Sequence, residues 1–460
     1  MTFMPMKSIN PINGEVLENY EQHSIEGVLG IVNSVDKSWH SWKNTSFDHR
    51  SRLMLNLASL LRSKRDELAR LITLEMGKII SESRSEIEKC GWVCEYYAGY
   101  AESFLVNEPV ATDYPDSYIS FRPLGVVLAV MPWNFPFWQV FRCAAPTLMA
   151  GNTLVLKHAG NVSGCSLAME DLFREAGFPE NAFRSILLPG SEMEPVVAHP
   201  AIRAVTLTGS TPAGRSLASL AGKYLKKSVL ELGGSDPYII LEDADLDKAV
   251  RLCVTSRLLN SGQSCIAAKR FIVVDQVYDA FCEKFRDVMS EARYGDPFDE
   301  SVTMGPLARY DLRDELHGQV LRSVEMGAVL SLGGKIPQGK GAFYPPTILE
   351  NVCPGMPAYS EELFGPVASI IRARNEKEAI EIANDTDFGL GAAVFTKNLE
   401  KGKLLAEDLM DAGCCFVNDF VRSDPRLPFG GIAESGYGRE LSSFGIREFV
   451  NVKTVVVNKA

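Results

Sequence analysis

The chain has 460 residues, and at roughly 150 residues per domain this length suggests about three domain-sized units. Hydrophobic residues make up 46% and charged residues 23%, which is typical of a globular protein and not of a disordered or fibrous one. The net charge of −11 disfavours contact with nucleic acid phosphates or anionic lipid. We therefore expect neither nucleic acid nor a membrane as a partner.

Cysteine usage indicates a reducing environment. The ten cysteines are irregularly spaced, and no pair forms the Cys-x-x-Cys of a zinc or redox site. We predict a cytoplasmic protein with no metal site. The first ten residues lack the apolar core of a signal peptide, and no segment approaches the ~20 apolar residues that span a bilayer.

The N-terminal part of the chain predicts helices that serve packing. Over 50–70, leucines recur at near-helical spacing among charged residues, and 71–98 continues in the same way.

From about residue 120 onward, short apolar runs alternate with helical stretches, which is typical of an α/β fold. The strands expected in a first unit are 125–131, 153–157, 185–188, 204–208 and 228–232. A second unit after Cys265 would contain strands 270–274, 368–372, 392–396 and 414–417, with a helix over 277–292. The last run, 450–458, reads as a strand without a neighbouring hairpin partner, and such an edge tends to pair with another chain.

The first motif with chemical meaning is a strand that turns into a helix at Gly209. The helix is expected to begin near Pro212, and a helix N-terminus fed by a strand can bind phosphate. Ser210 and Thr211 would add hydroxyl donors. The spacing is not the Gly-x-Gly-x-x-Gly fingerprint, so a purely structural turn is an equal alternative.

One cysteine differs in its setting from the others. Cys265 follows the small, polar segment 260–264, where a thiol is more accessible than in a core. Most free cysteines are buried and inert. That is the expectation for Cys90, Cys94, Cys143, Cys253 and Cys282.

Two polar side chains stand at the ends of apolar strands. Burial of Glu231, which precedes two glycines, would raise its pKa toward that of a general base, whereas the commoner alternative is a solvated or ion-paired glutamate. Asn134 stands among aromatic residues and prolines, where its amide could donate to an oxyanion. The alternative is that Asn134 caps the helix that Pro136 begins.

The chain resembles the aldehyde dehydrogenase superfamily from about residue 10 to residue 457. The resemblance is carried by the order and spacing of Asn134, Gly209, Glu231 and Cys265. Further matching segments are Leu-Val-Leu-Lys157, Glu362-Leu-Phe364-Gly-Pro, Pro428-Phe-Gly-Gly431 and Ser435-Gly-Tyr-Gly-Arg-Glu440. Within the superfamily the chain is most similar to the shorter bacterial succinate-semialdehyde dehydrogenases.

The resemblance implies an α/β fold in three parts. A Rossmann-type NAD(P)-binding domain would comprise 1–106 and 124–233, and an α/β catalytic domain would comprise 234–444. A small β bridging domain would be built from 107–123 and 445–460 and would join subunits into a homodimer or homotetramer.

The resemblance also implies a mechanism. Cys265 would attack the aldehyde, and the Asn134 amide and the Cys265 backbone N–H would hold the oxyanion of the thiohemiacetal. After hydride transfer, Glu231 would activate the water that hydrolyses the thioester. CoA-acylating relatives typically lack this glutamate, so hydrolysis to the acid is expected.

The expected reaction is the oxidation of succinate semialdehyde to succinate. A broad-range or other semialdehyde dehydrogenase is an alternative, and a catalytically silent binding protein of this fold is another. A cysteine hydrolase would need a histidine base, but none of the six histidines lies in a recognisable catalytic motif.

The cofactor is expected to be NADP or NAD. By resemblance, Lys157 and Glu362 would hold ribose hydroxyls, and NAD-preferring relatives carry a glutamate where this chain has Gly160. Without that carboxylate a 2′-phosphate meets no like charge, and His158 and Lys157 could add positive charge. We therefore expect NADP to be accepted at least comparably with NAD. The residues expected to contact the cofactor are Trp133, Lys157, Gly160, Gly209, Ser210 (pyrophosphate), Glu362 and Phe364 (nicotinamide).

The substrate carboxylate is expected to meet Arg142. Its guanidinium suits a carboxylate, it shares a helix face with Trp138, and succinate-semialdehyde dehydrogenases carry an arginine at this spacing after the oxyanion asparagine. A second arginine of some relatives is Leu259 here, so Ser423 and Ser264 would complete the contact. The alternative is that Arg142 forms a structural ion pair.

Overall fold

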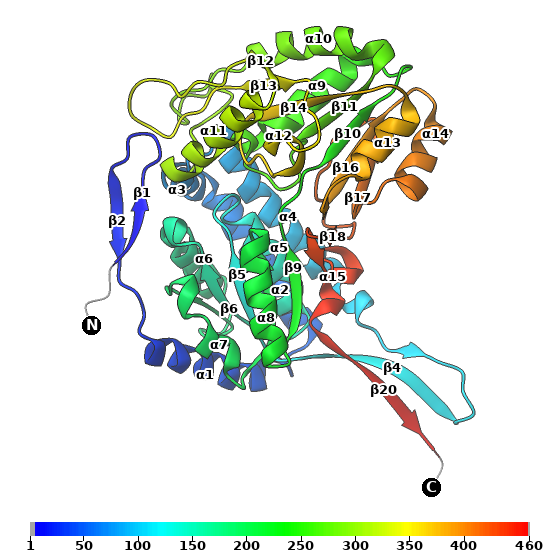
Figure 1. Cartoon of the computed structure of the whole chain (residues 1–460). Coiled ribbons are helices and arrows are strands. Elements are labelled where there is room, and N and C mark those ends of the chain that lie inside the picture. The colour runs from blue at the N-terminus through cyan, green and yellow to red at the C-terminus, as the bar shows by residue number, and fades with distance from the viewer. Residues whose placement is uncertain (1–4, 459–460) are drawn as a thin grey trace.

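The computed structural model describes residues 5–458 and places two large sheets in separate halves of the molecule (Figure 1). The first sheet has the order β19-β9-β8-β5-β6-β7, with β5 to β9 parallel and β19 antiparallel. Its strands are β5 (Val126–Met131), β6 (Thr153–His158), β7 (Phe183–Ile186), β8 (Ile202–Thr208), β9 (Lys227–Glu231) and β19 (Gly436–Tyr437). The helices between them are α5 (Trp138–Met149), α6 (Ser163–Glu175), α7 (Glu194–Ala198) and α8 (Thr211–Lys223).

The second sheet has the order β12-β13-β14-β11-β10-β16-β17 and is parallel except for the β12–β13 pair. Its strands are β10 (Pro237–Ile240), β11 (Arg270–Val274), β12 (Val329–Leu332), β13 (Thr347–Glu350), β14 (Val367–Ala373), β16 (Gly391–Phe395) and β17 (Cys414–Val417). Its main helices are α9 (Leu246–Leu258), α10 (Tyr278–Ser290), α11 (Tyr310–Glu325) and α13 (Glu376–Asn384). The predicted α/β class is confirmed, although the short strands β10, β12 and β13 were not foreseen.

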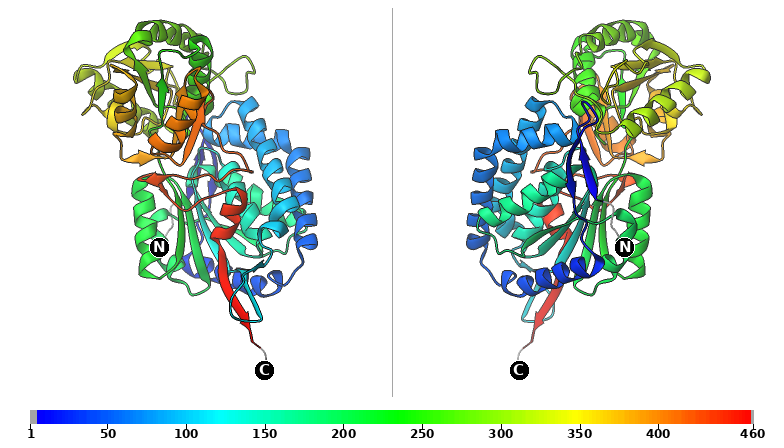
Figure 2. Two further views of the ribbon diagram at one scale, coloured as in Figure 1. Left: turned by 90° about the vertical axis from the view of Figure 1, so that its right-hand side faces the viewer. Right: turned by 90° about the vertical axis from the view of Figure 1, so that its left-hand side faces the viewer.

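A three-stranded sheet projects from the body of the molecule (Figure 2). In it, β20 (Val450–Val457) pairs antiparallel with β4 (Asp116–Pro123), which pairs in turn with β3 (Glu108–Pro109). The C-terminal strand thus finds a partner more than three hundred residues earlier in the chain. Its other edge pairs with no strand among residues 5–458.

Four helices pack beside the first sheet: α1 (Ile25–Trp42), α2 (Phe47–Ser63), α3 (Arg65–Met76) and α4 (Ile80–Phe104). The predicted helices 50–70 and 71–98 are right in kind but wrong in their limits. The chain breaks at Gly77, whose φ of 80° is left-handed and whose Cβ, if present, would lie 2.8 Å from Pro306. That requirement for glycine ends α3 and starts the long helix α4.

The remaining elements are short. They are β1 (Met6–Ile9), β2 (Val16–Tyr20), α12 (Pro357–Ser360), β15 (Phe388–Gly389), α14 (Leu399–Leu404), β18 (Ile432–Ala433) and α15 (Ser442–Glu448). The three-part domain division remains a prediction. Residues 1–4 and 459–460, which belong to its first and third parts, lie outside the residues that the structure describes. Within the described part, no helix is long and apolar enough to cross a membrane.

Candidate functional site

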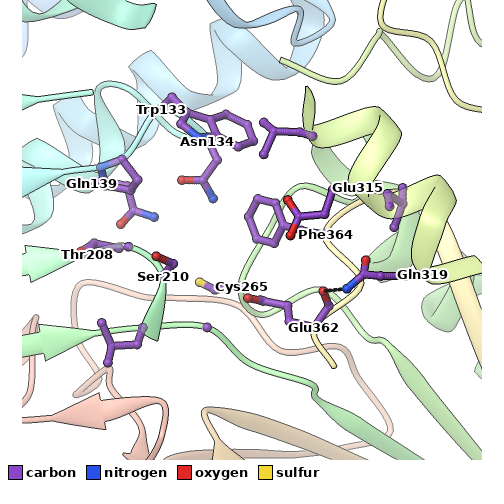
Figure 3. Close-up of a pocket in the computed structure, with 16 residues that line it drawn as sticks. Trp133, Asn134, Gln139, Thr208, Ser210, Cys265, Glu315, Gln319, Glu362 and Phe364 are labelled. Carbon is purple, nitrogen blue, oxygen red and sulfur yellow. Dashed lines mark hydrogen bonds between the residues drawn. The ribbon is translucent and has the colours of Figure 1, made fainter. Parts of the chain in front are cut away.

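Two cavities meet at Cys265. The first lies between the two large sheets, and its labelled lining includes Asn134, Ser210 and Phe364 (Figure 3). The second is reached from the side of α4 and α5 and contains Trp138, Arg142 and Ser423. Because Cys265 lines both cavities, its thiol can be approached from two directions. Cys265 is half-buried, whereas the five other cysteines named above are buried, as predicted.

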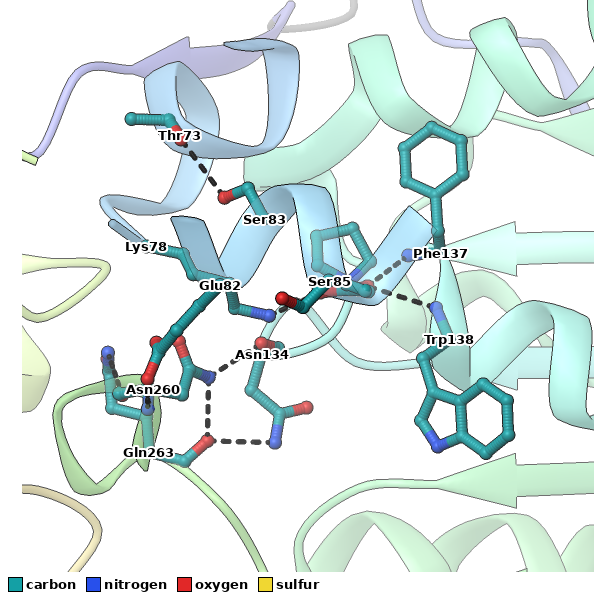
Figure 4. A network of polar contacts seen from close by, with 12 residues as sticks. Thr73, Lys78, Glu82, Ser83, Ser85, Asn134, Phe137, Trp138, Asn260 and Gln263 are labelled. Atoms are coloured by element: carbon teal, nitrogen blue, oxygen red, sulfur yellow. Dashed lines mark hydrogen bonds and ion pairs between the residues drawn. The ribbon is translucent and has the colours of Figure 1, made fainter. Parts of the chain in front are cut away.

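The loop that carries Cys265 is shaped by residues in left-handed conformation. Asn260, Ser261 and Gly262 have φ values of 53°, 54° and 76°. The Asn260 side-chain amide donates to the Asn134 carbonyl at 2.7 Å and to the Gln263 carbonyl at 3.1 Å, and the Asn134 amide donates to the same Gln263 carbonyl at 3.1 Å (Figure 4). These bonds hold the Asn134 side chain against the cysteine loop.

Lys269 fixes the other side of this loop. Its buried ammonium donates to the carbonyl oxygens of Ser264 and Cys265 at 3.1 and 2.8 Å, and it lies 3.4 Å from Glu362. Anchored carbonyls hold the peptide planes of the loop, and with them the Cys265 backbone N–H, in one orientation. Sequence reasoning missed both Asn260 and Lys269, since neither has a motif apart from its place beside the cysteine.

The electrostatics of the thiol are set mainly by burial. Burial raises the pKa of Cys265 to about 12, while the positive charges of Arg142 and Lys269 oppose that rise. The thiol is therefore protonated at neutral pH in this structure. Attack as a thiolate requires added positive charge or a group that accepts the proton.

Glu231 ends β9 in an apolar and acidic environment. Burial and then the charge of Glu440 raise the pKa of Glu231 well above its usual range, which confirms the predicted effect of burial. Neither carboxylate oxygen has a hydrogen-bond partner among the described residues. The carboxylate is directed at Gly430, where an added Cβ would lie 2.7 Å from Oε1. In this orientation Glu231 lines neither of the two cavities.

The alternative that Asn134 caps a helix is wrong. Glu86 of α4 fills that role, because its Oε1 accepts the backbone N–H groups of Phe137 and Trp138 at 2.8 and 3.0 Å. Glu86 also forms an ion pair with Lys78 in which both side chains are buried. The Asn134 side chain is bonded instead to the loop that carries Cys265.

Most of the predicted cofactor residues gather in the first cavity. Its lining includes Trp133, Gly209, Ser210, Glu362 and Phe364. Trp133 and Phe364 meet edge to face with ring centroids 5.8 Å apart, and Glu362 accepts the Gly234 N–H at 3.0 Å. Unforeseen members of the lining are Gln139, Thr208, Glu315 and Gln319 (Figure 3).

Other members of the predicted phosphate and ribose site are placed differently. The Thr211 hydroxyl donates to the Glu434 carbonyl at 3.3 Å, so it is already engaged. Lys157 and Gly160, at the end of β6 and in the turn after it, are not part of the cavity lining. Burial lowers the pKa of Lys157.

The prediction that His158 could supply positive charge is wrong. Its ring is buried, with Nε2 2.8 Å from the Pro136 carbonyl, and the Ala159 N–H donates to Nδ1 at 2.9 Å. Burial lowers the pKa of His158 to about 4, so the ring is neutral at physiological pH. The residue locks a turn and bears no charge.

The predicted substrate residues line the second cavity together with Cys265: they are Trp138, Arg142, Ser264 and Ser423. Arg142, however, forms an ion pair with Glu440, and both side chains are at most 5% exposed. Arg142 also donates to the Thr208 hydroxyl at 3.3 Å and lies over the Phe429 ring. The structure therefore contains the structural ion pair that was the alternative for this arginine.

Comparisons with known proteins agree with this geometry. The model of the aldehyde dehydrogenase family matches residues 3–455. A probable NADP(+) succinate-semialdehyde dehydrogenase of Synechocystis is 47% identical over 98% of this chain and 99% of its own length. An NADP(+) succinate-semialdehyde dehydrogenase of Mycolicibacterium paratuberculosis is 46% identical over 99% and 98% of the two chains. The crystal structure of succinic semialdehyde dehydrogenase from Streptococcus pyogenes with NADP+ superposes with a TM-score of 0.96 at 37% identity, covering 98% and 100%.

Proposed function

Because the chain belongs to the aldehyde dehydrogenase family, we propose that it oxidises succinate semialdehyde to succinate with NADP or NAD as the hydride acceptor. The observation that carries the substrate is the second cavity. It joins Cys265 to positively charged and hydroxyl side chains, which a neutral aldehyde would leave without a partner. The names of the two relatives of 46–47% identity support the same substrate.

In the proposed mechanism Cys265 is the nucleophile. The thiol first releases its proton to solvent, the thiolate sulfur then adds to the aldehyde carbon, and the Asn134 amide with the Cys265 backbone N–H stabilises the oxyanion that forms. The Asn134 amide is held by its bond to the Gln263 carbonyl, and the Lys269 bond to the Ser264 carbonyl fixes the peptide plane that carries the Cys265 N–H, so little reorganisation is needed at the moment of attack. After the hydride has left, Cys265 holds the acyl group as a thioester.

Glu231 is the proposed base for hydrolysis. It must first lose the proton that its raised pKa retains, and its side chain must turn from Gly430 toward the cysteine. It can then accept a proton from the water that attacks the thioester and releases the acid.

The first cavity fits a dinucleotide. Gly209 lacks a side chain at the point where β8 leads into α8, and Ser210 stands at that helix N-terminus, where a pyrophosphate is stabilised. Trp133 and Phe364 offer aromatic faces for a nicotinamide, and Glu362 offers a carboxylate for ribose hydroxyls. The bound oxidised cofactor supplies the hydride acceptor and a positive ring. We place Lys157 and Gly160 at the adenosine end and propose that NADP is used at least comparably with NAD.

We further propose a homodimer or homotetramer that works in the cytoplasm. The open edge of β20 supports association, and ten cysteines without a disulfide in the described chain fit a reducing compartment.

An activity assay on purified enzyme tests the proposal. NADPH or NADH formation at 340 nm would be compared for succinate semialdehyde and butanal, which share a four-carbon chain, with each cofactor in turn. We expect kcat/KM for succinate semialdehyde to exceed that for butanal by at least tenfold. Equal values would favour a broad-range enzyme, and no activity on any aldehyde would favour a silent binding protein.

A further inference from the structure

Lys89 is a cationic member of the second cavity that the sequence patterns did not single out. It lies on α4, far from Cys265 in sequence, yet both residues line this cavity. The Lys89 ammonium donates to the Ser423 hydroxyl at 2.8 Å and lies 4.2 Å from the centre of the Trp138 ring. Two of the residues already assigned to the substrate therefore hold this lysine in place.

No acidic side chain of the described residues contacts the Lys89 ammonium to balance its positive charge. Among the described residues, no carboxylate lies within 4.0 Å of its ammonium, although lysines elsewhere in the chain form ion pairs. Two acidic residues line the same cavity, but both are engaged: Glu86 binds Lys78 and caps α5, and Glu82 accepts the Asn260 N–H at 3.1 and 3.2 Å. A lysine ammonium has three N–H donors, and only one is used here.

Arg142 differs from Lys89 in this respect. Its guanidinium is paired with the buried carboxylate of Glu440, so the net charge of that pair is zero. A substrate carboxylate at Arg142 would have to compete with Glu440 or share the guanidinium with it. At Lys89 an incoming carboxylate would not have to displace a contacting carboxylate of the described residues, because Glu86 and Asp424 influence the pKa of Lys89 without forming an ion pair with it.

We propose that Lys89, together with the Ser423 hydroxyl, is the binding site for the carboxylate of the aldehyde substrate, and that Arg142 acts mainly as a structural partner of Glu440. This inference rests on the proposed function and assigns its substrate specificity to a residue of α4. The ammonium and the hydroxyl each donate to the carboxylate, while the aldehyde end extends toward Cys265. A substrate without a carboxylate gains nothing from Lys89.

The charge on Lys89 responds to pH. Burial and the neighbouring charge of Arg142 lower its pKa to about 8, while Cys90, Asp424 and Glu86 oppose the change. The other charged groups at this cavity are Glu82 and Arg422, and Arg422 is paired with Asp419. Above pH 8 the empty site therefore loses its positive charge, and the preference for a carboxylate should decline with it.

The test is a selectivity ratio, defined as kcat/KM for succinate semialdehyde divided by kcat/KM for butanal. A general loss of fold or of chemistry affects both values and cancels in this ratio. For Lys89→Met we expect the ratio to fall about 10- to 100-fold, mainly through KM for succinate semialdehyde, because a charge-assisted bond is lost. For Lys89→Arg we expect most of the ratio to be kept.

A matched control is Lys43→Met. Lys43 also lies over a tryptophan, 4.3 Å from the centre of Trp39, but outside both cavities that contain Cys265. We expect this variant to keep the wild-type ratio. As a second readout, the wild-type ratio should decrease between pH 7 and 9.5, whereas that of Lys89→Arg should stay constant because its guanidinium remains charged.

The outcomes distinguish a failure of the proposed function from a failure of the assignment to Lys89. If wild type shows no preference for succinate semialdehyde, the proposed function fails. If wild type has the preference and Lys89→Met keeps it, or loses activity on both aldehydes equally, the assignment to Lys89 is overturned while the proposed function stands.

Discussion

The guanidinium of Arg142 and the carboxylate of Glu440 form a buried ion pair near Cys265, with α5 on one side and the glycine-rich segment after Phe429 on the other. The same carboxylate contributes to the raised pKa of Glu231. One pair thus joins α5 to the segment between β19 and α15 and influences the pKa of the proposed base.

The first prediction concerns the stability of this pair. Arg142→Met would leave the Glu440 charge buried and unpaired, and we expect a loss of about 3–5 kcal/mol in the free energy of unfolding. The double variant Arg142→Met with Glu440→Gln should recover most of that loss. Urea midpoints measure both effects. Arg422→Met is the control, because its pair with Asp419 is solvent-exposed and worth only ~0.2–1 kcal/mol. If Arg142→Met were as stable as wild type, the ion pair with Glu440 would not stabilise the fold.

The second prediction separates acylation from hydrolysis. Cys265→Ala should abolish NADPH formation, because no thiohemiacetal can form. Glu231→Gln should still form one NADPH per site in a burst and then turn over about 10²- to 10⁴-fold more slowly than wild type. Stopped-flow absorbance at 340 nm distinguishes the two variants. Steady turnover of Cys265→Ala at the wild-type rate would exclude the proposed nucleophile.

The third prediction is the pH dependence of hydrolysis. Since burial and the charge of Glu440 raise the pKa of Glu231, its carboxyl keeps its proton to a higher pH than an ordinary glutamate and becomes a base only as the pH rises. The rate of the steady phase should therefore increase from pH 6 to pH 9. Single-turnover release of the acyl group measures this rate directly. Glu231→Gln should show no such rise, and a wild-type rate that is independent of pH would count against Glu231.

The raised pKa also affects stability. The folded protein holds a proton on Glu231 that the unfolded chain releases above its ordinary pKa of 4.5, so this group stabilises the fold less as the pH rises from that value. Glu231→Gln should therefore gain stability relative to wild type at pH 8 and not at pH 4. Urea unfolding at the two pH values provides this comparison.

The fourth prediction concerns cofactor choice. Gly160→Glu would place a carboxylate where NAD-preferring relatives carry one, and it should lower kcat/KM for NADP about tenfold while sparing NAD. Space allows the change, because the nearest atom to an added Cβ is a Met6 carbon at 3.6 Å. Gly160→Gln, of similar size but neutral, is the matched control. A wild-type preference for NAD of about a hundredfold would refute the proposed use of NADP.

The fifth prediction concerns assembly. Val452 and Val456 of β20 are 60% and 44% exposed, and replacing both by lysine would put charge on a strand that has an open edge. We expect the doubly substituted protein to be monomeric and folded, because the pairing of β20 with β4 remains available. Light scattering after size-exclusion chromatography gives the mass. An unchanged oligomer would remove β20 from the subunit interface.

Much of the fold was open to prediction from sequence because local patterns fix local structure. Apolar runs marked β5, β8, β11 and β17, and the small polar segment before Cys265 marked an accessible thiol. Burial of Glu231 could also be inferred, since a carboxyl at the end of an apolar strand loses its water. These properties depend on a few neighbouring residues.

Only the tertiary structure decided which distant groups meet. Arg142 has the same local sequence whether it binds a substrate or Glu440, and the packing of α5 against the segment near residue 440 settles its partner. His158 reads as a potential cation until burial between backbone carbonyls makes it neutral. Lys89 enters the cavity because α4 packs against α5, a contact that no local pattern records. Charge and its compensation depend on distance in space, and a sequence gives distance only along the chain.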